Sequence, residues 1–334
     1  MPHMFTDLPD LAAERLGGSV ITANDEFFAA KENLLKGSKP EWREGVYTDR
    51  GKLMDGWETR RRRTPGHDWA IIRLGLPGVV RGVVIDTTWF TGNYPEQASL
   101  EGCNLDSPDG LSSLGARASP SLPSASEAWH SLLPAAPLLG NQPNLFPIEV
   151  ATRVTHLRLN IFPDGGVARL RVHGEVVPNP HMFRAHPVDL AALANGGVVV
   201  AYSDRHYGNP QNMLLPGAST NMGDGWETRR RRGPGHDWAI VRLGRRGIVE
   251  RVELDTEHFK GNAPGSCRLE SCDASGSFDP DTVTWRTLVA EAPLQPDAHH
   301  HWEHLPTAPA THVRLNIYPD GGVSRLRLFG KANG

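Results

Sequence analysis

Cysteine, excess charge and long apolar runs are all scarce in this sequence. Its 334 residues include only three cysteines, a count that argues against a disulfide framework and is typical of a reducing compartment. The formal net charge of −3 gives no general attraction to nucleic acid or to anionic membranes. The apolar runs are too short to span a bilayer, and the first residues lack the pattern of a secretory signal. We therefore expect a soluble cytoplasmic protein that binds neither nucleic acid nor membranes.

Motifs for common cofactors and metals are also missing. The sequence contains no HExxH pair, CxxC pair, GxSxG elbow or phosphate-cradling glycine loop. The histidines His299–His301 and His304 are expected to form an exposed loop that binds metal only adventitiously. Cys103 and Cys272 occupy matching places in an internal repeat, which favours core packing over nucleophilic use. No cofactor is expected, while dependence on a divalent metal stays open.

Glycine and proline, by contrast, are abundant, and the sequence contains an internal duplication. The 35 glycines and 27 prolines favour many turns and short strands. The stretch Asp55–Gly75 returns as Asp224–Gly244 with differences only at Thr64/Gly233 and Ile72/Val241. The expected organisation is an N-terminal segment (1–16), a first repeat (17–178), a linker (179–195) and a second repeat (196–334). A Ser/Pro-rich insertion around Asp106–Ala125 lengthens the first repeat.

The pattern within each repeat is mostly that of strands. His156–Ile161 and Arg169–His173 alternate polar and apolar residues, as half-buried strands do. Trp69–Leu74 and Val79–Asp86 are expected to be two further strands, and short helices are expected at Glu26–Leu35 and Val188–Ala194. Their order resembles galactose-binding and discoidin-like modules. The predicted fold is therefore all-β, with two tandem duplicated jelly-roll β-sandwich domains.

Both copies of the repeated motif contain four consecutive arginines, Arg60–Arg63 and Arg229–Arg232. One interpretation is a solvated basic face. The alternative is that one face of the run pairs with acidic neighbours while the other offers planar forks to a carboxylate or a urea-like group. The structured flanks, Trp-Glu-Thr before the run and Pro-Gly-His-Asp-Trp after it, favour the alternative.

A histidine and an aspartate follow each arginine run, as His67-Asp68 and His236-Asp237. A histidine beside an aspartate is suited to general acid–base work near neutral pH. The alternative is structural: the aspartate caps the turn and the histidine packs on the nearby tryptophan. The sequence alone leaves both alternatives open.

The copies differ at the end of a predicted strand. The second copy has Glu257, His258 and Lys260 where the first has Thr88, Trp89 and Thr91. If only one copy is catalytic, this difference favours the second. A polar surface at the end of the strand is the alternative.

Three motifs together closely resemble the allantoicase family: DGWETRRRR-x-PGHDWAI, DTEHFKGNAPGSCRLE and THVRLNIYPDGGVSRLRLFG. The resemblance spans nearly the whole chain, including its two-copy layout. It implies two jelly-roll domains and a hydrolase of purine breakdown that cleaves allantoate to (S)-ureidoglycolate and urea. A non-catalytic carbohydrate- or ligand-binding protein of two jelly rolls is the alternative.

Allantoate has one carboxylate and two ureido arms. A site that binds it needs a cation for the carboxylate, hydrogen-bond acceptors for the ureido N–H groups and donors for the ureido carbonyls. The predicted catalytic residues are His258, Glu257, His236 and Asp237. The predicted substrate-binding residues are Glu227, Arg229, Arg231, Lys260, Asn262, Glu58, Arg60, Arg62 and His67. Homo-oligomer formation, the number of active copies and activity on ureidoglycolate stay open.

Overall fold

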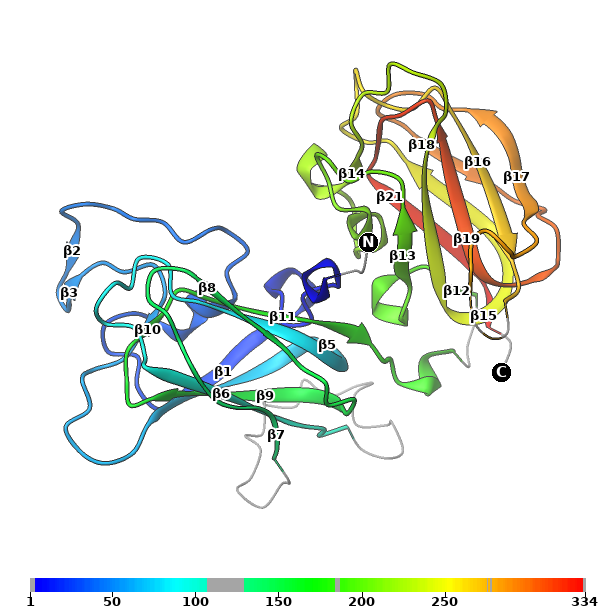
Figure 1. Ribbon diagram of the computed structural model, residues 1–334. Helices are drawn as coiled ribbons and strands as arrows, with labels where there is room; N and C mark the ends of the chain where they lie inside the picture. The colour runs from blue at the N-terminus through cyan, green and yellow to red at the C-terminus, as the bar shows by residue number, and fades with distance from the viewer. Residues whose placement is uncertain (1–3, 107–128, 184–186, 275, 277, 333–334) are drawn as a thin grey trace. The chain divides into compact units, whose positions relative to one another are not determined.

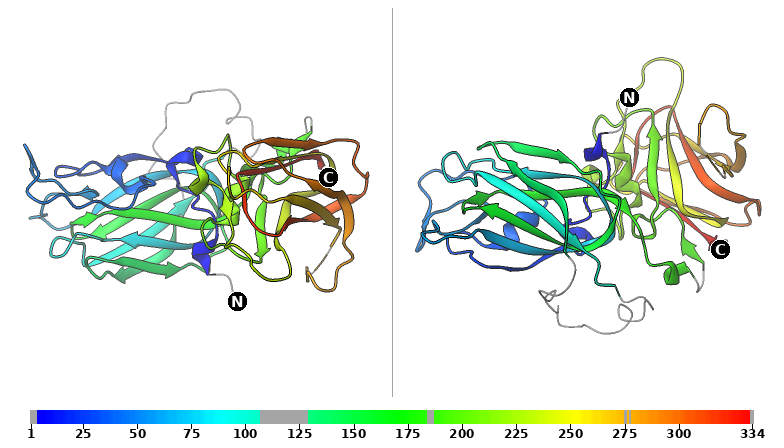
Figure 2. Two further views of the ribbon diagram at one scale, coloured as in Figure 1. Left: turned by 90° about the horizontal axis from the view of Figure 1, so that it is seen from above. Right: turned by 60° about the horizontal axis from the view of Figure 1, so that its bottom comes forward.

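The computed structural model describes residues 4–106, 129–183, 187–274, 276 and 278–332. The chain forms two compact units, Met1–Val177 and Pro178–Gly334. Most of the Ser/Pro-rich insertion lies outside the described residues. The predicted all-β architecture is confirmed, and each unit is a jelly-roll sandwich of two strand layers (Figures 1 and 2).

In the first unit, β5 (Asp68–Asp86) belongs to both layers. Its first half pairs with β1 and β9, and β6 and β7 extend this layer, whereas its second half pairs with β8 and β11. The other strands of this unit are β1 (Ser19–Ala23), β2 (Tyr47–Thr48), β3 (Gly51–Lys52), β4 (Trp57–Glu58), β6 (Gln97–Cys103), β7 (His130–Pro137), β8 (Pro143–Pro147), β9 (Arg153–Phe162), β10 (Gly166–Val167) and β11 (Arg169–Val176).

The second unit repeats this plan around β15 (Asp237–Asp255). One layer contains β13, β19, β16 and β17, and the other contains β18, β21 and the added short strand β12. Their bounds are β12 (Val188–Asp189), β13 (Val198–Tyr202), β14 (Trp226–Glu227), β16 (Ser266–Cys272), β17 (Arg286–Pro293), β18 (His299–Trp302), β19 (Pro309–Tyr318), β20 (Gly322–Val323) and β21 (Arg325–Ala332).

The helices within the described ranges are all short 3-10 turns, so the two helical predictions are largely wrong. In the predicted range Glu26–Leu35 the helix is η3 (Lys31–Leu35). In the range Val188–Ala194, η5 (Leu193–Asn195) overlaps only the last two residues, and Val188–Asp189 is a strand that pairs with β21. Leu34 and Leu35 are buried, so packing and not helical periodicity accounts for the apolar residues there. None of the described helices is long and apolar enough to cross a membrane. The remaining turns are η1 (Phe5–Asp7), η2 (Glu14–Leu16), η4 (Pro180–Phe183), η6 (Pro210–Leu214) and η7 (Met222–Asp224).

Two other expectations need correction. The strands expected at Trp69–Leu74 and Val79–Asp86 are one continuous strand, β5, whose register with β9 shifts between Arg73 and Gly78. The histidines 299–301, expected in a loop, form β18, because they pair with Glu253–Asp255 of β15. The alternating strands predicted at His156–Ile161 and Arg169–His173 are confirmed.

Aromatic side chains at the loop end of each sandwich hold the repeated motif in place. Trp226 and Phe259 are both fully buried. A Cβ placed on Gly322 would lie 2.0 Å from the Phe259 ring, so only glycine lets β20 approach this ring. β20 pairs in turn with β14, the first strand of the motif. Cys103 and Cys272 are buried in the core, as their matching positions predicted.

Candidate active site

Polar residues of the motif, together with residues of other segments, form two groups in each unit. We call Glu58, Arg60, Arg62 and Asn93 the loop-end cluster of the first unit, with Glu227, Arg229, Arg231 and Asn262 in the second. We call His67, Glu101, Arg158 and Asn160 the sheet-face cluster of the first unit, with His236, Glu270, Arg314 and Asn316 in the second.

The loop-end cluster is built around a carboxylate–amide contact. Asn93 donates from Nδ2 to Glu58 Oε1 at 2.6 Å, and Asn262 makes the same contact with Glu227 at 2.6 Å. Burial raises the pKa of the Glu58 carboxyl above its ordinary value, and the Asn93 hydrogen bond only partly opposes this shift. The structure therefore brings together the acidic and amide residues that the sequence predicted as substrate acceptors.

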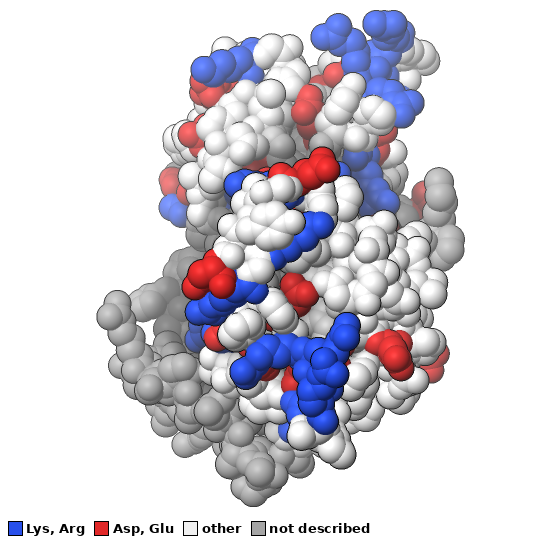
Figure 3. Space-filling view, turned by 90° about the vertical axis from the view of Figure 1, so that its left-hand side faces the viewer, with Lys and Arg blue, Asp and Glu red and all other residues white. Residues whose placement is uncertain are grey.

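The arginine runs are divided between pairing and solvent. Arg60 bonds Asp25 at 2.7 Å, and Arg62 bonds the buried carboxylate of Asp68. Arg61 and Arg63 are exposed. Figure 3 shows Lys and Arg side chains in groups on the face seen there, with acidic side chains beside them. Half of the first run is thus engaged by carboxylates, and this run is not a uniform basic surface.

The second unit repeats this division. Arg231 bonds Asp237 at 2.5 Å, while Arg229 contacts His206 at 3.0 Å. Asp237 also accepts a hydrogen bond from Ser203, but its Oδ2 atom is buried without a hydrogen-bond partner in the described part of the chain.

The sheet-face cluster is produced by strand register. Ser99 of β6 faces Asn160 of β9, and Glu101 faces Arg158, as direct cross-strand partners. Their alternation with Leu157 and Leu159 puts them on the face opposite the core. Asn160 donates to Ser99 Oγ at 3.1 Å and to Glu101 Oε2 at 2.9 Å, and Arg158 Nε donates to Glu101 at 2.6 Å.

His67 completes this network, and its neighbours define its tautomer. Its Nε2 lies 3.2 Å from Asn160 Oδ1, and the ring packs on Phe162. Because the Asn160 amide nitrogen donates to Ser99 and Glu101, its oxygen faces His67 and must accept a hydrogen bond from the Nε2–H group. Nδ1 of His67 is therefore the nitrogen that can exchange protons. The same reasoning holds for His236, whose Nε2 lies 3.0 Å from Asn316 Oδ1.

The aspartates that follow these histidines in the sequence are bonded to arginines in the structure. Asp68 and Asp237 begin β5 and β15, where successive side chains point to opposite faces. Both carboxylates bond an arginine of the run, as described above. The described contacts include none between Asp68 and the His67 ring or between Asp237 and the His236 ring.

A cavity of about 470 Å³ lies over the sheet-face cluster of the first unit. His67, Ser99, Glu101, Arg158 and Asn160 line one part of it. Trp69 and Phe162 supply apolar walls. The hydrogen bond from Arg158, the largest influence, lowers the pKa of Glu101, so this carboxylate stays ionised near neutral pH. The cavity thus combines a cation, an anion, an amide and a titratable ring.

The second unit differs at the position of Ser99, where it has Arg268. Arg268 lies 2.8 Å from Glu270 and donates to Thr287 Oγ1 at 3.1 Å. Arg314 also donates to Glu270, at 2.6 Å. Two guanidinium groups therefore share Glu270, whereas one guanidinium bonds Glu101 in the first unit.

The second-copy residues Glu257, His258 and Lys260 have other contacts. His258 Nε2 lies 3.0 Å from the Ser219 carbonyl oxygen, and its backbone adopts φ 71°. Trp89 in the first unit has the same φ, and its indole donates to the Pro40 carbonyl. Lys260 is exposed and lies 3.7 Å from Asp297. The described contacts do not join His258 to His236, and its predicted catalytic role stays a prediction.

Sequence reasoning missed the strand residues Glu101, Arg158 and Asn160. A signal was present, because their counterparts Glu270, Arg314 and Asn316 keep the same residue types in the second copy. Comparison of the copies strand by strand, and not only at their loops, would have found them.

Comparison with known proteins gives a consistent result. The family model described as "Allantoicase repeat" matches residues 9–177 and 188–333. "Probable allantoicase" of Nocardia farcinica is 48% identical over 335 residues, covering 100% of this chain and 97% of the relative. "Probable allantoicase" of Pseudomonas aeruginosa (strain UCBPP-PA14) is 49% identical, covering 98% and 96%. The crystal structure of allantoicase from Saccharomyces cerevisiae has a TM-score of 0.78 at 36% identity, covering 96% of this chain and 92% of that one.

Proposed function

The chain belongs to the allantoicase family and hydrolyses allantoate to (S)-ureidoglycolate and urea, and we propose that the reaction takes place at the sheet-face cluster of the first unit. The observation that carries this placement is the cavity that His67, Arg158 and Asn160 line together. Perturbed titratable groups and convergent polar atoms in a cavity are typical of active sites. The alternative of a non-catalytic carbohydrate-binding protein is not favoured, because the family match covers both repeats.

Substrate recognition rests on Arg158. The described contacts engage its Nε atom through Glu101, which leaves the two terminal nitrogens for a carboxylate. A planar guanidinium binds a carboxylate with two parallel hydrogen bonds. Ser99 then supplies a hydrogen-bonding hydroxyl group for a ureido arm, and Trp69 and Phe162 keep water away from one side.

Proton transfer rests on His67. In the reaction a C–O bond forms between water and the central carbon, and the C–N bond to one ureido arm breaks. The water loses a proton, and the departing urea nitrogen gains one. Nδ1 of His67 can accept the first proton and return it to the leaving group, because Nε2 is fixed as a donor to Asn160. A positioned general acid–base group typically contributes about 10²–10⁴-fold in rate.

The loop-end residues have a supporting role in this proposal. Glu58, Arg60, Arg62 and Asn93 hold the loop that carries His67 into β5, and the corresponding residues of the second unit do the same for His236. We keep His236, Asp237, Glu257 and His258 as candidates for a second site, together with Glu227, Arg229, Arg231, Lys260 and Asn262.

A matched pair of variants tests the placement. Arg158→Ala should raise KM for allantoate at least about tenfold, because a charge-assisted bidentate contact contributes more than about 1.4 kcal/mol. Arg314→Ala removes the corresponding guanidinium of the second unit and should leave KM within about twofold of wild type. Urea and ureidoglycolate release measures both. The opposite ranking would place the substrate in the second unit.

We also infer a cytoplasmic location and no nucleic-acid partner. Cys267 and Cys272 are buried free thiols, as is typical of proteins in reducing compartments. The net charge of −3 and the pairing of the arginine runs oppose binding to nucleic acid. Homo-oligomer formation stays open, and light scattering of the purified protein measures it.

A further inference from the structure

Three side chains with metal-binding atoms converge where β15 ends. Asp255 is the last residue of β15, and His299 is its direct cross-strand partner at the start of β18. Glu257 follows two residues after Asp255. One ligand atom from each of the three lies within 4.8 Å of the others. These residues are separate from the sheet-face clusters.

One of these carboxylates lacks a partner for a buried atom. Glu257 Oε2 is buried and has no hydrogen-bond partner in the described part of the chain. Asp255 is only 6% exposed, and its Oδ1 accepts the Glu257 backbone N–H at 2.7 Å. Two carboxylates taken out of water at close range are costly unless a cation compensates them. A bound cation would therefore stabilise this cluster.

We propose that Asp255, Glu257 and His299 bind a divalent transition-metal ion of the Zn²⁺ or Co²⁺ class. Two carboxylate oxygens and one imidazole nitrogen are ligands that these ions accept. His299 Nδ1 lies 3.3 Å from Asp255 Oδ2. Metal bonds of about 2.0–2.2 Å put neighbouring ligands of a tetrahedral ion about 3.3–3.6 Å apart, so this pair already has the required spacing.

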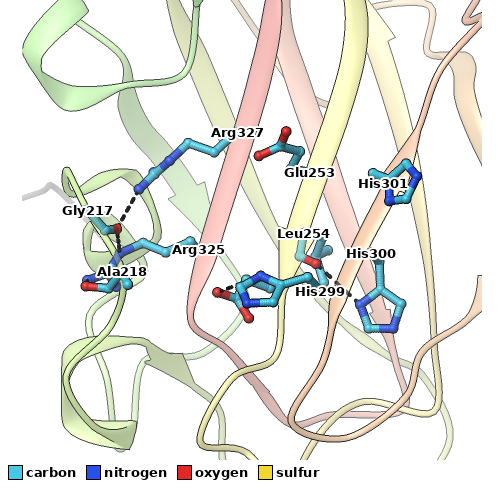
Figure 4. Close-up of a pocket in the computed structure, with 10 residues that line it drawn as sticks. Gly217, Ala218, Glu253, Leu254, His299, His300, His301, Arg325 and Arg327 are labelled. Carbon is cyan, nitrogen blue, oxygen red and sulfur yellow. Dashed lines mark hydrogen bonds and ion pairs between the residues drawn. The ribbon is translucent and has the colours of Figure 1, made fainter.

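The site is open to solvent on one side. Asp255 and His299 line a cavity of about 440 Å³ that Glu253, His300, His301 and Arg327 also line (Figure 4). His299 is a largely exposed side chain, so its ring can adjust toward Glu257. An ion with three protein ligands would keep a fourth position open to the cavity.

The charges of Arg325 and Arg327 act on Asp255, but neither guanidinium is bonded to a carboxylate of this cluster in the described contacts. Arg325 reaches away from it to the Gly217 and Ala218 carbonyls and pairs with Asp224 at 2.8 Å (Figure 4). Arg327 lies 3.7 Å from Asp189 and donates to other carbonyls.

The first unit provides an internal control for this proposal. Asp86 there is the counterpart of Asp255, but its cross-strand partner is Pro143 and the residue two positions on is Thr88. Thr88 satisfies Asp86 Oδ1 through its backbone N–H and its hydroxyl group. The two extra ligands are therefore specific to the second unit.

Metal titration of the full chain tests the site. After dialysis against EDTA, Co²⁺ binding is followed by visible absorption and displaced with Zn²⁺, and the metal content per chain is measured. We expect one ion per chain. His299→Ala and Glu257→Gln should each weaken binding at least about tenfold, since each removes a ligand. His299 is exposed, so its variant should fold, and circular dichroism checks this.

His301→Ala and Asp86→Asn are the matched controls. His301 is an exposed histidine of the same strand, and Asp86 is the first-unit carboxylate, so neither change should alter affinity beyond about twofold. Absence of saturable one-to-one binding in wild type would overturn the proposal. So would a site weakened by His301→Ala but not by His299→Ala, because the histidine run would then be an adventitious binder.

Discussion

Arg268 lies 2.8 Å from Glu270 in the second unit, at the position where the first unit has Ser99 beside Glu101. The two repeats therefore differ within the same polar cluster. A serine leaves the Glu101–Arg158 pair accessible from the cavity, whereas an arginine competes with Arg314 for the same carboxylate. If the substrate binds at the sheet-face cluster, as proposed, this difference separates the two units in substrate binding.

We expect the substitution of Ser99 by arginine to reduce activity, and the reverse substitution of Arg268 by serine to leave activity unchanged. Ser99→Arg should lower kcat/KM at least about tenfold, because the new guanidinium would pair with Glu101 and occupy the substrate's place. Arg268→Ser is the matched change in the second unit and should leave the native activity within about twofold. Steady-state urea release measures both. Full activity of Ser99→Arg would contradict the proposed cavity.

Removal of the proton-transfer group predicts a specific kinetic signature. His67→Ala should lower kcat by about 10²–10⁴-fold with little change in KM, since general acid–base catalysis acts in the transition state. Asn160→Ala should lower kcat less and shift the pH profile, because Asn160 only fixes the ring and its tautomer. An unchanged kcat in the His67 variant would sink its assignment.

A substitution that introduces the first-unit residue at position 258 can distinguish a structural role of His258 from a catalytic one. His258→Trp introduces the residue found at the corresponding position, Trp89, whose ring also contacts a loop carbonyl. If His258 anchors the loop, this variant should keep kcat within about twofold, while His258→Ala should lower the melting temperature by a few degrees. A collapse of kcat in both variants, with unchanged melting temperatures, would instead support the catalytic prediction.

His312 predicts a pH dependence of stability. Burial, aided by the charge of Arg242, lowers the pKa of His312 to about 4 from an ordinary value of 6.5. Above pH 6.5 both folded and unfolded forms are neutral, so no stability is lost. As the pH falls from 6.5 toward 4, His312 becomes protonated in the unfolded chain but stays neutral in the folded chain. The free energy of unfolding therefore declines.

Urea unfolding at pH 7 and pH 5 measures this effect. His312 should account for roughly 1 kcal/mol of the decline between them. His312→Gln should show a correspondingly smaller decline than wild type, and His301→Gln, an exposed histidine, should match wild type. Equal pH dependence in wild type and His312→Gln would refute the prediction.

Periodicity and repetition were sufficient to predict the architecture. The alternation in His156–Ile161 and its copy directly reflects which side chains meet the core, so the two jelly rolls were predictable. The site was harder to predict from the sequence, because Glu101 and Arg158 are 57 residues apart and come together only through strand register. Local sequence also suggested a His67-Asp68 pair, but Asp68 bonds Arg62 of the motif while the His67 ring contacts Asn160, a residue distant in sequence. The position of β18 likewise depended on pairing with a strand distant in sequence.

The order of synthesis matters for a chain whose repeats are this similar. β11, the last strand of the first unit, pairs with β5, and its Arg169 is bonded to the Ser38 and Asp55 carbonyls. The first unit therefore closes only when this strand has left the ribosome, before most of the second copy has been made. Domains that fold in turn avoid pairing with the wrong partner. The near-identical motif at Asp224–Gly244 thus emerges when its competitor is already closed, which protects the chain from strand exchange between its own repeats.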